Sequence, residues 1–117
     1  MVDLAKERRA YAKALEQGVE LLRRMLADIP EVRRAVLFGS YAAGRRDLVT
    51  DLDVLVEMDS PLDFVTRTAR LYQKLDLGVD VDLLVYTPAE LAEMPEGGLA
   101  RRALAEGEVI YERDAAR

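Results

Sequence analysis

The sequence predicts an α/β fold: a single domain with a mixed sheet of three to four strands, flanked by helices, and a long N-terminal helix. Segments with helical periodicity alternate along the chain with short runs of branched apolar residues, and 117 residues suffice for one hydrophobic core. We expect one domain over residues 1–117, with the N-terminal helix at about 4–28. A central core at about 35–86 and C-terminal helices and a strand at about 88–112 should follow.

The first expected helix is amphipathic. Apolar side chains recur every three to four residues from Tyr11 to Ile29, which places them on one face of a helix. Pro30 follows, and the residue before a proline is disfavoured in the helical conformation. The helix should therefore bury one stripe against the sheet and end just before this proline.

Short runs rich in branched apolar residues predict the strands. They cover residues 35–38, 51–57 and 79–86, with a last strand expected at a sheet edge over residues 109–111. Capping residues indicate the shorter helices. Ser60, followed by proline, predicts a helix to about residue 75, and the segment from Thr87 to Glu90 has the form of a capping box. One more helix is expected over residues 98–106.

The composition excludes several classes of function. The chain has no cysteine and no histidine, so disulfides, thiolate zinc sites and imidazole bases are excluded. A net charge of −5 argues against general nucleic-acid binding, because affinity for phosphate backbones needs a positive field. No apolar run is long enough to span a membrane and the N-terminus opens into a charged stretch, so we expect a cytoplasmic protein.

Two aspartates at the start of the second strand form the main candidate site. Because side chains alternate along a strand, Asp51 and Asp53 should project to one side while Leu52 points into the core. Such a pair repels itself unless a cation lies between the carboxylates, and oxygen ligands select hard ions such as Mg²⁺. An isolated Asp-x-Asp is most often an ordinary exposed strand, so the neighbouring residues carry the interpretation.

Two further features support a site for phosphates and metal. Gly39 and Ser40 follow an apolar strand, where glycine lets a phosphate approach the backbone and the serine hydroxyl can bind its oxygens. On the third strand, Asp80 and Asp82 share one face, and one of them completes a three-carboxylate site if this strand neighbours the second. We favour Asp82, which directly precedes an apolar run. It would act as a metal ligand or as a proton acceptor, and both roles stay open.

Together these residues fit one reaction. Two Mg²⁺ ions held by Asp51 and Asp53 can bind a triphosphate and an attacking hydroxyl during in-line displacement at the α-phosphorus. Most of the Arg-Arg pairs in the chain should lie on solvated helix faces near acidic neighbours, and only Arg45 and Arg46 are expected to contact phosphate.

The spacing of these motifs resembles that of a known superfamily. Residues 37–40, ten intervening residues and then residues 51–56 resemble the signature of DNA polymerase β-like nucleotidyltransferases, in particular the minimal nucleotidyltransferases. The resemblance extends through residues 81–84, 87–91 and 109–112. It implies that Gly39 and Ser40 bind nucleotide phosphate, that Asp51 and Asp53 hold the metals, and that Asp82 is the third carboxylate.

The resemblance also implies a co-substrate and a partner. Minimal nucleotidyltransferases are often encoded beside a HEPN-domain protein, and in such pairs they act as antitoxins that transfer AMP from ATP to a tyrosine of the HEPN ribonuclease. Many relatives carry arginine directly after Gly-Ser and again two residues later, where this chain has Tyr41 and Ala43. Arg45 or Arg46 would have to take over the triphosphate contact.

Two alternatives stay open. A non-catalytic binding module of the same fold would neutralise its partner by contact, although it would have no need to hold like charges together. A small-molecule nucleotidyltransferase usually carries an additional substrate-binding domain. Tyr41 and Tyr72 are candidates for base stacking, but tyrosines at such positions more often pack in the core or at a sheet edge. The sequence does not decide between a monomer and a homo-oligomer.

Overall fold

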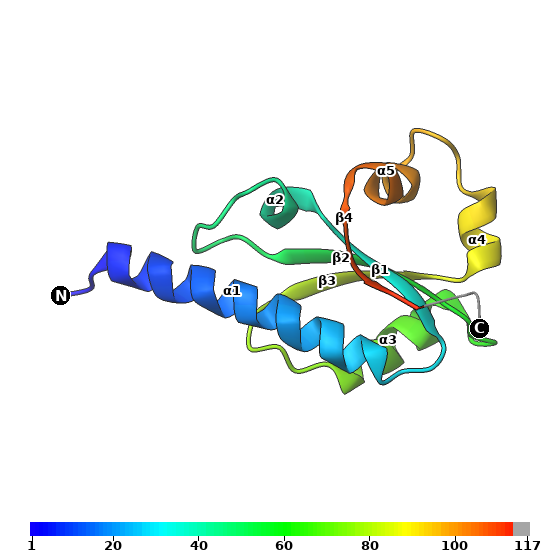
Figure 1. Ribbon diagram of the computed structural model, residues 1–117, viewed down its shortest axis with the longest axis horizontal. Helices are drawn as coiled ribbons and strands as arrows, with labels where there is room; N and C mark the ends of the chain where they lie inside the picture. Colours follow the sequence, from blue (N-terminus) through cyan, green and yellow to red (C-terminus); the bar gives the residue numbers. More distant parts are fainter. Residues whose placement is uncertain (114–117) are drawn as a thin grey trace.

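Four strands form one mixed sheet in the order β3-β2-β1-β4 (Figure 1). In the computed structural model, which describes residues 1–113, the strands are β1 (Val32–Phe38), β2 (Leu52–Met58), β3 (Val81–Tyr86) and β4 (Glu108–Glu112). β1 is antiparallel to both β2 and β4, whereas β2 and β3 are parallel. The prediction of a mixed sheet with an edge strand near the C-terminus is confirmed. The last part of the expected domain, residues 114–117, lies outside the described residues.

Helices cover both faces of this sheet (Figure 1). The main core lies between one face and the two longest helices, α1 (Leu4–Ala27) and α3 (Phe64–Lys74). A smaller apolar cluster lies between the opposite face and the helices α4 (Pro88–Glu93) and α5 (Leu99–Glu106). The short helix α2 (Gly39–Ala42) follows β1 directly, at one end of the sheet.

The central strand β2 is buried on both faces. Leu52, Val54 and Val56 pack into the main core, whereas Leu55 belongs to the smaller cluster. Because side chains alternate along a strand, Asp53 lies on the same face as Leu55. The candidate site therefore belongs to the face that α4 and α5 cover.

The predicted amphipathic N-terminal helix is confirmed. Leu15, Leu22 and Leu26 are fully buried along one stripe of α1. Asp3 caps the helix by accepting a hydrogen bond from the Lys6 amide at 3.1 Å. The first two turns of α1 are exposed and extend beyond the sheet (Figure 1).

The predicted start of the next long helix at Ser60 is wrong. The Ser60 hydroxyl accepts a hydrogen bond from the Leu62 amide (3.1 Å) within a turn, and α3 begins only after Asp63. The Asp63 carboxylate accepts from the Thr66 amide at 2.8 Å and is the cap. Serine followed by proline fits a turn as well as a helix start, and the aspartate three residues later is an equally strong capping residue.

Other predicted helices and strands differ from the observed ones only at their first or last residues. β1 begins at Val32, three residues earlier than expected, because Arg34 stays on the strand and pairs with Glu57 of β2 at 3.2 Å. The capping box is confirmed: the Thr87 hydroxyl accepts from the Glu90 amide, and the Glu90 carboxylate accepts from the Thr87 amide.

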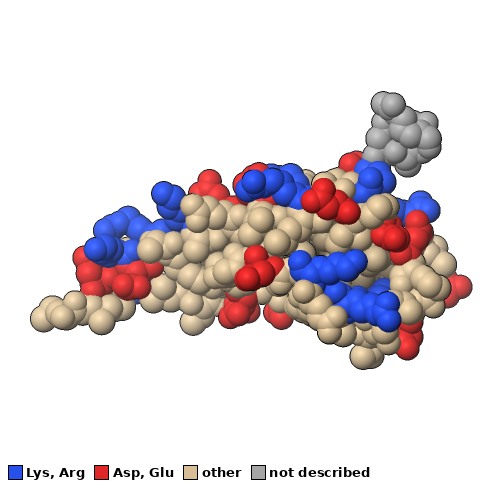
Figure 2. Space-filling view, turned by 90° about the horizontal axis from the view of Figure 1, so that it is seen from below, with Lys and Arg blue, Asp and Glu red and all other residues tan. Residues whose placement is uncertain are grey.

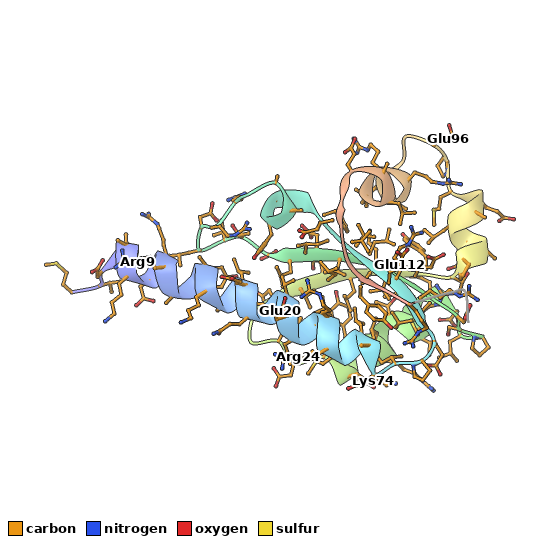
Figure 3. All side chains as sticks on the ribbon, in the orientation of Figure 1. Arg9, Glu20, Arg24, Lys74, Glu96 and Glu112 are labelled. Atoms are coloured by element: carbon orange, nitrogen blue, oxygen red, sulfur yellow. The ribbon has the colours of Figure 1, made fainter. Side chains whose placement is uncertain are left out.

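Figure 2 shows the face formed by α1 and α3, over which basic and acidic side chains are interspersed. Lys74 of α3 and Arg24 of α1 both lie on this side of the molecule (Figure 3). Among residues 1–113, no helix is long and apolar enough to cross a membrane.

Candidate active site

The predicted carboxylates come together at the end of the sheet where the parallel strands β2 and β3 begin. Asp53 of β2 lies directly opposite Asp82 of β3 in the register of the two strands. Asp51 precedes β2 by one residue and is half-buried. Asp80 precedes β3 rather than belonging to it, and its carbonyl accepts a hydrogen bond from the Leu52 amide at 3.2 Å. The strand register therefore favours Asp82 over Asp80 as the neighbour of Asp53.

The electrostatic environment of Asp53 is unfavourable to its charge. Burial raises the pKa of the Asp53 carboxyl, and the negative charges of Asp82 and then Asp51 raise that pKa further. Asp53 therefore lies close enough to both Asp82 and Asp51 to be repelled by their charges. A cation placed among them would remove this repulsion.

These carboxylates do not form a complete metal cage by themselves. Within residues 1–113, no group of three or more acidic side chains is gathered closely enough to hold a metal ion unaided. Mg²⁺ commonly binds through one or two carboxylates and takes its remaining ligands from water and substrate phosphates. The arrangement thus fits a metal that arrives with a phosphorylated substrate.

Gly39 lies against Asp53, whose carboxylate occupies the space that a side chain at position 39 would need. Its φ angle is +77°, a conformation that side-chain-bearing residues rarely adopt. A Cβ atom at this position would overlap the Asp53 carboxylate. The residue pairing places Phe38, the last residue of β1, opposite Asp53, so the chain turns into α2 immediately beside the carboxylate. Ser40 follows in the first turn of α2.

The predicted phosphate contacts Arg45 and Arg46 already have partners, in the loop and in α2 respectively. The Arg45 guanidinium pairs with Asp47 at 2.5 Å. The Arg46 guanidinium lies 3.4 Å from the centre of the Tyr41 ring and donates to the Tyr41 carbonyl at 2.6 Å. Among the described residues, no hydrogen bond or ion pair joins either arginine to the candidate carboxylates.

The two tyrosines considered for base stacking have packing roles. Tyr41 is buried in the main core. The Tyr72 hydroxyl accepts from the Leu83 amide at 2.7 Å and donates to the Val81 carbonyl at 3.2 Å. Tyr72 therefore satisfies backbone groups along the outer edge of β3.

Sequence reasoning missed Tyr11 as a residue that supports the site. Its hydroxyl donates to the Thr50 carbonyl at 2.8 Å and so ties α1 to the segment directly before Asp51. The pKa of Tyr11 is raised by burial and by the nearby charges of Asp51, Asp80 and Asp47. Tyr11 belongs to the apolar stripe of the helix, and the local sequence carries no signal that its hydroxyl reaches a loop 39 residues away.

Comparison with known proteins is consistent with this geometry. Residues 20–116 match the family described as polymerase beta, nucleotidyltransferase. The chain belongs to this nucleotidyltransferase family. The resemblance inferred from the Gly-Ser and Asp-x-Asp motifs is therefore confirmed, and the protein is a nucleotidyltransferase. No curated protein matches its sequence significantly.

Solved structures of low sequence identity share the nucleotidyltransferase fold. A candidate nucleotidyltransferase from Sulfolobus solfataricus is 16% identical, with a TM-score of 0.61 over 98% of this chain and 93% of that one. A toxin–antitoxin structure with AMP-PNP is 24% identical, with a TM-score of 0.58 over 84% and 76% of the two chains. The toxin–antitoxin structure MntA-HepT is 20% identical, with a TM-score of 0.54 over 84% and 73%.

Proposed function

We propose that this nucleotidyltransferase moves AMP, or another nucleoside monophosphate, from a nucleoside triphosphate to a hydroxyl group of a partner protein. The observation that carries the proposal is the repulsion of Asp53 by Asp82 and Asp51 next to Gly39, which suits a cation bound together with a nucleotide phosphate. The similar structures include toxin–antitoxin complexes, one of them with AMP-PNP. They support ATP as the donor, a role as antitoxin, and a HEPN-domain toxin as the partner.

The three carboxylates are the residues that would hold Mg²⁺. Bound between Asp51 and Asp53, two ions would neutralise charge on the triphosphate and on the leaving pyrophosphate. Asp82 is exposed at the start of β3, on the outer side of Asp53. It would complete the ligand set or accept the proton of the acceptor hydroxyl.

The residues after β1 would bind the phosphates of the donor. Gly39 lets the backbone pass directly against Asp53, so a phosphate at this carboxylate could approach the main chain, and the Ser40 hydroxyl would donate to a phosphate oxygen. Arg45 and Arg46 would reach the nucleotide only by giving up their contacts with Asp47 and Tyr41. If these two arginines bind phosphate, they must therefore change conformation and lose the contacts described above.

The proposed transfer would take place between these carboxylates and the phosphate-binding residues. The acceptor oxygen attacks the α-phosphorus from the side of Asp82, and its proton passes to a carboxylate or to water. The bond from the α-phosphorus to its bridging oxygen breaks on the opposite side, and pyrophosphate leaves with the electron pair. The products are a nucleotidylated hydroxyl and pyrophosphate. Because Asp82 is exposed, a side chain on the surface of another protein can approach this side of the site.

The test is the intact mass of the proposed partner, a HEPN-domain protein, measured after co-expression with this chain. We expect adducts of nucleoside monophosphate mass with the wild type and none with the Asp51→Asn, Asp53→Asn double variant. Asp76→Asn, which changes an exposed carboxylate outside the site, is the matched control and should modify the partner normally. A partner that co-purifies unmodified with wild type and double variant alike would refute the transfer and favour a binding module.

A further inference from the structure

A cavity of about 350 Å³ opens between α2 and α5, next to the candidate site. Phe38 and Gly39 at the end of β1 and Ala42 of α2 line one side. Arg102 and Glu106 of α5, one helical turn apart, line the other. Figure 1 shows α2 and α5 on the same side of the sheet, opposite α1 and α3. Apart from Gly39, none of the residues assigned a role above lines this cavity.

Gly39 connects the cavity to the candidate carboxylates. It lies against Asp53 and is also part of the cavity wall. Across the sheet, from β3 towards β4, Asp82 comes first, then Asp53, then the end of β1 and the cavity beside it. A ligand whose α-phosphate lies at Asp53 can therefore extend past Gly39, away from the acceptor side, into the space between α2 and α5.

Arg102 is the positively charged residue that lines this cavity. Its side chain is exposed and forms no hydrogen bond or ion pair with any other residue among 1–113, and no other lysine or arginine in that part of the chain lines the cavity. The neighbouring Arg101, in contrast, donates to the Ala92 carbonyl at 3.1 Å. Arg45 and Arg46 already have partners. Arg102 can thus bind an anion without giving up an existing contact.

We propose that Arg102 binds the β- and γ-phosphates of the donor nucleotide in this cavity, and then the pyrophosphate that leaves. The inference rests on the proposed function, because it assumes a nucleoside triphosphate at Asp53. A guanidinium group suits this task, since its planar donors match two phosphate oxygens at once. It also stabilises the charge that develops on the leaving group. Glu106 lines the same cavity and repels phosphates, so it should weaken the binding that Arg102 provides.

The opposite effects of two substitutions test the assignment. Binding of AMP-PNP, tripolyphosphate and AMP is measured by calorimetry with Mg²⁺ present. We expect Arg102→Gln to weaken AMP-PNP and tripolyphosphate binding about tenfold, the loss of one charged hydrogen-bonding group, and to change AMP binding by less than about twofold. Glu106→Gln should strengthen binding of both polyphosphates about twofold, because a repelling charge is removed. Arg9→Gln, on the projecting end of α1 (Figure 3), is the control and should change nothing.

Other outcomes overturn the assignment. If AMP loses as much affinity as AMP-PNP in Arg102→Gln, or if Glu106→Gln weakens AMP-PNP, the cavity holds the nucleoside instead. Unchanged polyphosphate affinity in a folded Arg102→Gln protein, or a wild type that binds no polyphosphate, also refutes it. Failure of the proposed function would look different from failure of this assignment. Polyphosphate binding would still depend on Arg102, but the partner protein would stay unmodified.

Discussion

The guanidinium group of Arg67 forms two hydrogen bonds with the carboxylate of Glu90, at 2.7 and 2.9 Å, and so ties α3 to α4. Only 4% of the Arg67 side chain is exposed. The same guanidinium donates to the carbonyls of Leu62 and Val85, which satisfies its remaining donors. Because Glu90 also closes the capping box of α4, one carboxylate stabilises both a helix terminus and a buried cation.

We predict that Glu90→Gln lowers the free energy of unfolding by about 1 kcal/mol, because buried Arg67 loses its counter-charge while the Glu90 side chain, 39% exposed, is partly screened by solvent. The pKa of Glu90 is lowered, mainly by the Arg67 hydrogen bonds. A lowered folded-state pKa means that the contribution is present above the pKa of the unfolded chain and is lost as pH falls through the folded value. Urea unfolding should therefore show a difference at neutral pH that shrinks in acid. Glu93→Gln, exposed on the same helix, should behave as wild type.

Because Asp53 is repelled by its neighbours, we expect its neutralisation to stabilise the protein, opposite to the effect of Glu90→Gln. Its pKa is raised, so its ionised form costs stability at neutral pH; the cost shrinks as pH falls through the folded value and is gone below the pKa of the unfolded chain. Asp53→Asn should raise the melting temperature of the metal-free protein by about 3 °C while removing transfer activity. Stabilisation by Mg²⁺ with nucleotide should be seen in the wild type only, and should weaken in acid at a higher pH than for an ordinary aspartate. A lower melting temperature for Asp53→Asn would contradict this account.

The close approach of Gly39 to Asp53 can be separated from its backbone conformation. Gly39→Ala suffers both the strain of a positive φ and overlap with the carboxylate, whereas Gly97→Ala, at φ +82° with no neighbour within 4 Å, suffers the strain alone. We expect a loss of about 1 kcal/mol for Gly97→Ala and at least about 2 kcal/mol for Gly39→Ala. Only Gly39→Ala should also abolish binding of AMP-PNP with Mg²⁺. Equal stability losses in thermal unfolding would argue against the overlap.

The hydrogen bond from Tyr11 to Thr50 should hold the segment before Asp51 in place. Tyr11→Phe removes this bond alone and should lower the free energy of unfolding by about 1 kcal/mol. Hydrogen exchange at the amides of residues 49–51 should become faster, because α1 no longer holds the loop. Tyr111→Phe is the control, since no hydrogen bond of the Tyr111 hydroxyl occurs among residues 1–113. Unchanged exchange in Tyr11→Phe would mean that the loop is held by other contacts.

Features that depend on neighbouring residues could be predicted from the sequence. The buried stripe of α1 follows from helical periodicity, and the capping box at Thr87 involves groups only three residues apart. The start of α3 could not be predicted, because Ser60 and Asp63 are both good caps and only one can begin the helix. Local signals thus identify an element more securely than they choose between two nearby starting points.

The fold class, the family and the candidate residues Gly39, Asp53 and Asp82 could be predicted from the sequence. Motif spacing and strand alternation are local properties, so they can be recognised without knowing how the chain packs. The position of Asp82 opposite Asp53 required the folded structure, because strand register depends on how distant segments close the core. Only the tertiary structure decided that Arg46 stacks on Tyr41 and that Arg102 shares a cavity with Gly39. Long side chains have many conformers, and the contacts that select one come from segments that only folding brings together.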